Sequence, residues 1–177
     1  ILGFASLLKR PGLTCEQQQT YIDIIEKSGE RMLGVINNLI EISKIESGQM
    51  RITIEPTDVL EQMDFIYSFF KPEVEKKGMK IFYEYSLSSR DTLMRTDREK
   101  LYAVLINLVK NAIKYTDKGF IQFGCHKIPG FLEFYVKDTG IGIAQEEIGK
   151  VFDRFVQTQD VMTRKYEGAG LGLAISK

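Results

Sequence analysis

Asp138 stands at the end of an alternating apolar run and is followed by two glycines, a combination that could hold a flat polar ligand. Leu132 and Val136 share its phase, so its carboxylate is expected on the apolar side of a strand. Burying a carboxylate costs on the order of several kcal/mol unless hydrogen-bond donors meet it. Gly140 and Gly142 permit positive φ and a close approach of a ligand to the backbone. An ordinary turn capped by the aspartate is the alternative.

Two asparagines and a lysine recur at helical spacing in the segment before that strand. Asn107, Asn111 and Lys114 are four and three residues apart, which aligns them along one edge of a helix. An amide oxygen is a hard ligand that suits Mg²⁺, and an ammonium group beside it can neutralise a polyphosphate. The pattern predicts a site for a metal-bound phosphate chain, and a solvated helix face is the alternative.

A run of glycines near the end of the sequence passes directly into an apolar helical segment. Gly168, Gly170 and Gly172 alternate with Ala169 and Leu171. Such a turn presents free backbone N–H groups, and the start of a helix adds positive partial charge. The combination therefore predicts a place for a phosphate group.

The segment from 145 to 167 separates the aspartate from this glycine run and is predicted to form a lid. Its second half is polar and carries Arg164 and Lys165, which could reach a terminal phosphate. Phe152 and Phe155 are three residues apart in a stretch expected to be helical, where they could attach the lid to the domain. Plain packing of the phenylalanines and plain solvation of the basic residues are the alternatives.

A helical region precedes all of these motifs. Residues 1–48 are predicted to form part of a helical hairpin, with a turn at Pro11 and Gly12 and with Thr14 capping the second helix. The second helix carries a broad apolar stripe made of Ile25, Met32, Leu33, Val35, Ile36, Leu39, Ile40 and Ile42. Because this stripe is too wide for one partner helix, we expect dimerisation into a four-helix bundle, with packing onto the following domain as the alternative.

Residues 49–177 are predicted to form one α+β domain. The expected elements are a strand over 51–54, a helix over 57–77, a strand over 81–87, a helix over 97–115, and two antiparallel strands around Pro129 and Gly130. The buried side of the second of these helices is expected at Leu101, Val104, Leu105, Leu108 and Ala112. Strands and helices without a regular strand-helix-strand repeat favour a mixed sheet with helices on one face.

Composition and charge exclude several classes of protein. The chain has 177 residues, 44% of them hydrophobic, which suffices for one packed domain and a helical appendage. Lys plus Arg and Asp plus Glu both number 24, so no overall charge draws the chain to nucleic acid or to a membrane surface. Two cysteines without metal-binding spacing indicate a reducing compartment. We expect a cytoplasmic protein, attached to a membrane, if at all, only through parts of its parent outside this chain.

Four of these motifs, in this order and spacing, resemble those of the ATP-binding domain of sensor histidine kinases. The segment from Asn107 to Tyr115 is similar to the asparagine box of that family, and residues 138–143 are similar to its first glycine box. Residues 151–155 resemble its phenylalanine box and residues 168–175 its second glycine box. Residues 1–48 look like part of the family's dimerisation and histidine-phosphotransfer hairpin.

The resemblance implies a Bergerat-type α/β sandwich that binds ATP and Mg²⁺. It implies that Asp138 accepts the adenine amino group, that Asn111 holds Mg²⁺ against the phosphates, and that Asn107, Asn111 and Lys114 serve catalysis. The residues expected to contact ATP are Asn111, Lys114, Tyr115, Asp138, Gly140, Gly142, Ile143, Arg164, Lys165, Gly168, Gly170, Leu171 and Gly172. One departure from the family pattern is Ala169, where a threonine is common.

The resemblance also implies transfer of the γ-phosphate to a histidine on the hairpin of a homodimer, and then to an aspartate on a response-regulator receiver domain. The single histidine, His126, lies on the polar phase of a predicted strand and is not expected to accept phosphate. In the family the acceptor would lie roughly nine residues before Ile1. The ATP-binding domain of the family would also continue past Lys177.

Two other functions stay open at the level of sequence. Type II topoisomerases, MutL-like repair proteins and certain chaperones share the implied fold and similar boxes. In those ATPases the resemblance places a glutamate where this chain has Asn107, and an amide cannot act as a base toward water. A regulatory or degenerate module that binds nucleotide without chemistry is the third possibility.

Overall fold

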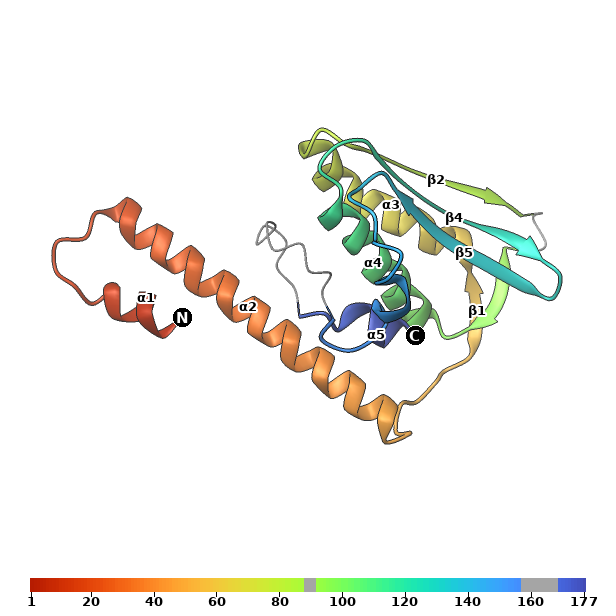
Figure 1. Ribbon diagram of the computed structural model, residues 1–177, viewed down its shortest axis with the longest axis horizontal. Helices are drawn as coiled ribbons and strands as arrows, with labels where there is room; N and C mark the ends of the chain where they lie inside the picture. The colour runs from red at the N-terminus through yellow and green to blue at the C-terminus, as the bar shows by residue number, and fades with distance from the viewer. Residues whose placement is uncertain (88–91, 157–168) are drawn as a thin grey trace. The chain divides into compact units, whose positions relative to one another are not determined.

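The computed structural model describes residues 1–87, 92–156 and 169–177 (Figure 1). The chain divides into two compact units, Ile1–Met50 and Arg51–Lys177. Among the described residues, none of the helices combines the length and the apolar character that crossing a membrane requires.

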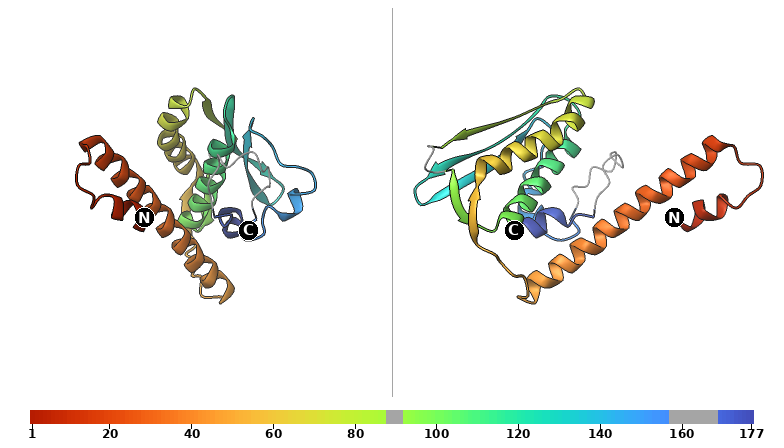
Figure 2. Two further views of the ribbon diagram at one scale, coloured as in Figure 1. Left: turned by 60° about the vertical axis from the view of Figure 1, so that its left-hand side comes forward. Right: turned by 180° about the vertical axis from the view of Figure 1, so that it is seen from behind.

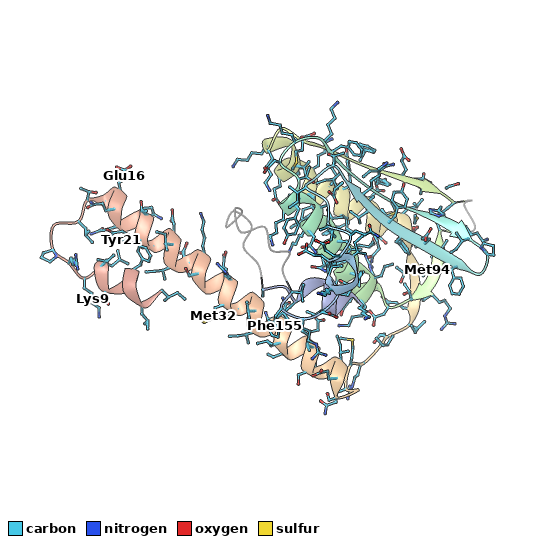
Figure 3. The ribbon with its side chains drawn as sticks, viewed as in Figure 1. Lys9, Glu16, Tyr21, Met32, Met94 and Phe155 are labelled. Atoms are coloured by element: carbon cyan, nitrogen blue, oxygen red, sulfur yellow. The ribbon has the colours of Figure 1, made fainter. Side chains whose placement is uncertain are left out.

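The first unit is a hairpin of two helices, α1 (Leu2–Leu7) and α2 (Cys15–Glu46). The predicted cap of the second helix is confirmed, because the Thr14 hydroxyl oxygen accepts the Gln17 backbone N–H at 3.2 Å and the Gln17 side-chain oxygen accepts the Thr14 backbone N–H at 3.0 Å. The two helices meet where the ring of Tyr21 lies 5.5 Å from that of Phe4, centroid to centroid (Figure 3). The predicted hairpin is therefore present.

Most of the apolar stripe of α2 is exposed. Leu33 and Met32 are 62% and 55% exposed, and Ile42 is the one buried residue of the helix. Since α1 has six residues and α2 has 32, α1 is too short to cover the stripe. Burial of this face therefore requires a partner other than α1.

The second unit is built on a three-stranded sheet in the order β2-β4-β5, formed by β2 (Lys80–Ser86), β4 (Phe120–Ile128) and β5 (Phe131–Asp138). β2 runs parallel to β4, and β4 runs antiparallel to β5, so the sheet is mixed. Helices α3 (Val59–Lys76) and α4 (Arg98–Tyr115) lie on one face of it (Figure 2). The core between the two layers includes Val59, Ile66, Phe70, Leu105, Val109, Ile121 and Phe123. The predicted α+β sandwich with helices on one face is confirmed.

Capping residues in the sequence fix where these two helices begin and end. Asp58 caps α3 by accepting the Leu60 backbone N–H at 2.9 Å, and Asp97 caps α4 by accepting the Lys100 backbone N–H at 3.0 Å. Gly78, with a φ of 73°, follows the end of α3. Both predicted helices are confirmed to within a few residues.

The buried side of α4 differs slightly from the prediction. Its buried residues are Leu105, Val109, Ala112 and Ile113. Val104 and Leu108, which were expected on that side, are only half-buried. These four residues are spaced by four, three and one positions, which places them on a single face of the helix. Compared with the predicted face, the buried face is rotated toward Val109 and Ile113.

The strand expected over 51–54 is wrong. Those residues are exposed and form no strand, and the backbone N–H of Thr53 is instead donated to the carboxylate of Asp97 at 2.8 Å. The strand lies just afterwards, as β1 (Glu55–Asp58), and pairs antiparallel with β3 (Leu93–Thr96) in a separate two-stranded sheet. β3 was not predicted, because a four-residue strand shows too little alternation to be recognised.

The segment after β5 contains a short 3₁₀ helix, η1 (Ile148–Lys150), and the chain ends in α5 (Gly172–Ser176). The helical stretch expected around Phe152 and Phe155 is wrong. Both side chains are exposed, and Phe155 adopts a φ of 60°. Its backbone N–H bonds to the carbonyl oxygen of Gly170 at 2.9 Å, so the segment is held by backbone contacts and not by packing of the phenylalanine rings.

Candidate functional site

The end of α4 is bonded to the glycine turn that follows β5. The backbone N–H of Ile141 is donated to the carbonyl oxygen of Tyr115 at 3.2 Å. A Cβ atom on Gly140 would lie 2.3 Å from the same oxygen, so only glycine permits this approach. The predicted asparagine segment and the predicted first glycine turn therefore meet in space.

Asp138 lies on the predicted face of the sheet but is not buried. It is paired with Ile121 of β4, and cross-strand partners point to the same face, here the one that carries the core. The predicted burial of its carboxylate is wrong, because Asp138 is the last residue of β5 and is exposed. Its Oδ1 accepts the backbone N–H of Gly140 at 2.8 Å. The carboxylate thus caps the turn, as in the simpler alternative, and stays accessible to a ligand.

Thr139 fastens the same turn to the start of β4, a role that the sequence did not suggest. Its hydroxyl oxygen accepts the backbone N–H of Phe120 at 2.9 Å. A Cβ atom on Gly119 would lie 2.1 Å from this oxygen, so glycine is required there as well. The turn is consequently held from two sides, by α4 and by β4.

Lys114 and Tyr115 occupy the last turn of α4, beside this loop. The Lys114 ammonium group donates a hydrogen bond to the Tyr115 hydroxyl oxygen at 2.8 Å. It also lies 4.5 Å from the centre of the Tyr115 ring. Both side chains are half-buried, as is Asn111 one turn earlier. A cation and an amide therefore lie on the helix that supports the turn.

Asn107 joins α4 to the start of α5. Its Nδ2 donates to the hydroxyl oxygen of Ser176 at 2.8 Å, and that hydroxyl donates to the carbonyl oxygen of Gly172 at 3.1 Å. A Cβ atom on Gly172 would lie 2.2 Å from the Oδ1 of Asn107, so the two motifs are in direct contact. Ser176 was missed by sequence reasoning, although its position four residues after Gly172 places both on one face of a helix.

Gly170 and Leu171, which precede Gly172 in the glycine run, are also closely packed. Gly170 has a φ of 67°, and a Cβ atom there would lie 2.7 Å from the carbonyl oxygen of Val156. Leu171 is buried, with 1% of its surface exposed. Three predicted site residues, Arg164, Lys165 and Gly168, and the second half of the predicted lid, 157–167, lie outside the described residues.

The two glycine turns are attached to α4 eight residues apart, which corresponds to about 12 Å along a helix axis. The turn with Asp138 meets the helix at Tyr115, and the turn with Gly172 meets it at Asn107. Asn111 lies midway between them in the sequence. An exposed carboxylate at one end, backbone N–H groups at the other, and an amide and a cation on the same helix suit a ligand with a polar base and a phosphate chain.

His126 lies away from this arrangement. It alternates with the core residues of β4, so it points to the sheet face opposite α3 and α4. Its Nε2 lies 2.8 Å from a carboxylate oxygen of Glu133 of β5. The interpretation of His126 as a strand residue is therefore confirmed.

Two family models match the chain. Residues 1–48 match the His Kinase A (phospho-acceptor) domain, and residues 96–177 match the histidine kinase-, DNA gyrase B-, and HSP90-like ATPase. The autoinducer 2 sensor kinase/phosphatase LuxQ of Vibrio parahaemolyticus is 36% identical over the whole chain, which covers 21% of that protein. An uncharacterized sensor-like histidine kinase of Rhizobium meliloti is 34% identical over the whole chain, which covers 34% of it. The chain thus spans about a fifth to a third of the length of these relatives.

Solved structures show the same likeness. Full-length ShkA in complex with AMPPNP has a TM-score of 0.78 and 31% identity, over 99% of this chain and 36% of that one. The histidine kinase ThkA in complex with the response regulator protein TrrA has a TM-score of 0.73 and 26% identity, over 88% of this chain and 45% of that one. Because both family models and these relatives and solved structures agree, the chain belongs to the sensor histidine kinases.

Proposed function

We propose that this chain is the catalytic region of a protein-histidine kinase, which binds Mg-ATP and transfers the γ-phosphate to a histidine on the hairpin. The observation that carries the proposal is the attachment of both glycine turns to α4, through Tyr115 and Asn107. The likeness to ShkA, whose structure contains AMPPNP, supports a nucleotide as the ligand. Residues 1–48 would form the dimerisation hairpin and residues 49–177 the ATP-binding domain.

The base of the nucleotide would lie at the turn after β5. The exposed carboxylate of Asp138 is an acceptor for the exocyclic amino group of adenine, and Gly140 has no side chain to obstruct a flat ring. Gly142, with a φ of 71°, and the half-exposed Ile143 follow in the same loop and would supply apolar contact. Tyr115 would line the nucleotide from the end of α4.

The phosphates would lie toward the other turn. Lys114 supplies positive charge, and the backbone N–H groups of Gly170, Leu171 and Gly172 are suited to phosphate oxygens. Among the described residues, no three His, Cys, Asp or Glu side chains are grouped to hold a metal ion. A bound Mg²⁺ would therefore take most of its oxygen ligands from phosphate and water, with Asn111 supplying one, and would neutralise charge on the phosphates. We propose the same phosphate contacts for Arg164, Lys165 and Gly168.

An ATP-driven clamp is less well supported than a kinase. The position that would need a general base is Asn107, whose amide has no basic group and is bonded to Ser176. Water activation by this residue is therefore not expected, and hydrolysis of bound ATP should be slow.

The proposed partners follow from the relatives. ThkA has been crystallised with a response regulator, which supports onward transfer from the histidine to an aspartate of a receiver domain. The exposed stripe of α2 supports a homodimer that forms through residues 1–48. Both phosphate transfers, first to the histidine and then to the aspartate, would take place in the cytoplasm.

The proposal is tested by separating nucleotide binding from phosphate transfer. The chain should bind Mg-ATP in a calorimetric titration, yet gain no acid-labile, base-stable phosphate from labelled ATP, because His126 faces away from the site. A longer piece of the parent protein that includes a histidine upstream of Ile1 should form phosphohistidine. Asn111→Asp should impair this transfer by altering metal coordination, whereas His126→Gln should leave it unchanged.

Three outcomes would count against the proposal. Failure of the chain to bind ATP would remove the nucleotide site. Rapid phosphorylation of His126 would overturn the assignment of the acceptor. Binding without transfer in the longer protein would favour a module that binds nucleotide without chemistry.

A further inference from the structure

We propose that Ser176 is a positioning residue of the nucleotide site, which acts through Asn107 to hold the turn over 170–172 against α4. The inference rests on the proposed function, because it concerns the turn that would receive the phosphate chain. Ser176 does not belong to the predicted glycine motif and would not itself touch the nucleotide.

The hydrogen bonds of Ser176 fix the orientation of the Asn107 amide. A serine hydroxyl has a single proton, and here it is donated to the carbonyl oxygen of Gly172 at 3.1 Å. The hydroxyl oxygen is then an acceptor for Asn107, whose Nδ2 lies 2.8 Å away. This arrangement places the Oδ1 of Asn107 on the side of Gly172. Without the hydroxyl, nothing in this contact would distinguish the two ends of the amide.

The contact also sets the distance between α5 and α4. A Cβ atom on Gly172 would lie 2.2 Å from the Asn107 Oδ1, so the backbone of the turn rests directly on the asparagine side chain. The two preceding residues are held elsewhere, Gly170 by Phe155 and Leu171 by burial. The attachment at Gly172 therefore ties the turn to the helix that carries Asn111 and Lys114.

The other end of the site is attached independently. Ile141 is bonded to the Tyr115 carbonyl oxygen, eight residues further along α4 than Asn107. Loss of the Ser176 hydroxyl should consequently disturb the phosphate end and leave the base end unchanged. A change in affinity that grows with the number of phosphates is the signature of such a role.

The test compares the binding of ATP, ADP and adenosine to the unmodified chain and to four variants. Mg²⁺ is present throughout, and affinity is measured by calorimetry or, for adenosine, by NMR titration. Ser176→Ala should weaken ATP binding roughly three- to tenfold, as expected for one lost hydrogen bond, weaken ADP binding, and leave adenosine binding unchanged. Asn107→Ala should do the same, and the double variant should bind ATP no more weakly than Asn107→Ala alone, because both changes break one contact. Ser176→Thr keeps the hydroxyl and should restore binding.

Ser28→Ala is the matched control. The Ser28 hydroxyl also donates to the carbonyl oxygen four residues earlier, at 2.7 Å, but it lies on α2 in the first unit. It should leave all three affinities unchanged. If Ser176→Ala does not fold, Ser176→Cys serves in its place, because a thiol is a weaker donor and acceptor.

The outcomes separate this inference from the proposed function. Unchanged ATP affinity in Ser176→Ala, equal loss for adenosine and ATP, or additive effects of the two alanine changes would each overturn the role of Ser176 while leaving the nucleotide site in place. Failure of the unmodified chain to bind ATP would overturn both.

Discussion

The backbone N–H of Ile141 lies 3.2 Å from the carbonyl oxygen of Tyr115 and is donated to it. Carbonyl groups in the last turn of a helix have no partner within the helix, and this one is satisfied by a loop that follows a strand of the sheet. The end of α4 and the turn after β5 therefore form one structural unit. A change in either is expected to affect the site formed by both.

Asp138→Asn should weaken ATP binding by more than about tenfold, because a hydrogen bond to a charged group contributes roughly 1.5–3 kcal/mol. The amide presents a donor where the carboxylate presents only acceptors, and the exocyclic amino group of adenine is itself a donor. The turn should persist, since an asparagine oxygen can still accept the Gly140 N–H. Calorimetric titration measures the affinity.

Asp23→Asn is the control for this change, because Asp23 is an exposed aspartate on α2 in the first unit. It should bind ATP like the unmodified chain. Equal affinity of the Asp138 variant and the unmodified chain would remove Asp138 from the nucleotide site.

Gly140→Ala should damage the same turn sterically. Its Cβ atom would lie 2.3 Å from the Tyr115 carbonyl oxygen and 2.8 Å from the Asp138 Oδ1. Relieving such contacts typically costs about 1–3 kcal/mol of stability, so both the unfolding midpoint and nucleotide affinity should fall. Gly149→Ala is the matched control, because nothing lies within 4 Å of its Cβ position and its φ is not positive. A Gly140 variant as stable as the Gly149 variant would contradict the contact.

The features that could be predicted from the sequence are those set by neighbouring residues. Thr14 precedes a helical stretch and caps it as predicted, and Asp58 and Asp97 precede the two long helices of the second unit and cap them in the same way. The alternation of Ile121, Phe123 and Cys125 likewise predicted β4, because its period of two follows from the geometry of any strand.

The features that could not be predicted depend on residues far apart in the chain. The bond between Asn107 and Ser176 spans 69 positions, and helical spacing gives no information on which helices meet. β1 was misplaced because its partner, β3, comes more than 30 residues later. The exposure of Asp138 was missed because phase along a strand predicts the face of a sheet but not how far the core extends along it.

Acid should destabilise the second unit through Asp97. Backbone N–H bonds from Thr53 and then from Lys100 hold the pKa of this carboxyl below its ordinary value of 3.8. Because the folded pKa is the lower one, the stabilisation is present above about pH 4 and is lost as the pH falls through the folded value. Asp97→Asn should therefore be less stable at pH 7 and should lose less stability on acidification. Urea unfolding from pH 7 to pH 3 measures this, and parallel pH profiles for both proteins would contradict it.

The stripe of α2 should mediate self-association. The whole chain should sediment as a larger species than a protein that starts at Gln49, because Leu33, Ile36 and their neighbours expose a continuous apolar face. Leu33→Gln should weaken the association, whereas Lys27→Gln, at an exposed polar position on the same helix, should not. If the whole chain and the shorter protein both sediment as monomers, residues 1–48 do not mediate assembly.

Two buried threonines provide a test of the packing at the end of α4. Thr116 and Thr57 are each 2% exposed. The Thr57 hydroxyl donates to the carbonyl oxygen of Glu55 at 3.3 Å, whereas the Thr116 hydroxyl has no hydrogen-bond partner among the described residues. A buried polar group without a partner costs about 1–3 kcal/mol, and a satisfied one contributes roughly 1 kcal/mol.

Replacement by valine should therefore have opposite effects at the two positions. Thr116→Val should raise the free energy of unfolding by about 1 kcal/mol, since it removes an unsatisfied hydroxyl. The extended backbone of Thr116, with a φ of −109° and a ψ of 119°, also suits a β-branched side chain. Thr57→Val should lower the free energy of unfolding, because it breaks a hydrogen bond in β1. Urea unfolding of both variants without nucleotide decides the matter, and a loss of stability in Thr116→Val as large as that in Thr57→Val would mean that the Thr116 hydroxyl is satisfied in solution, by a water molecule or by another part of the chain.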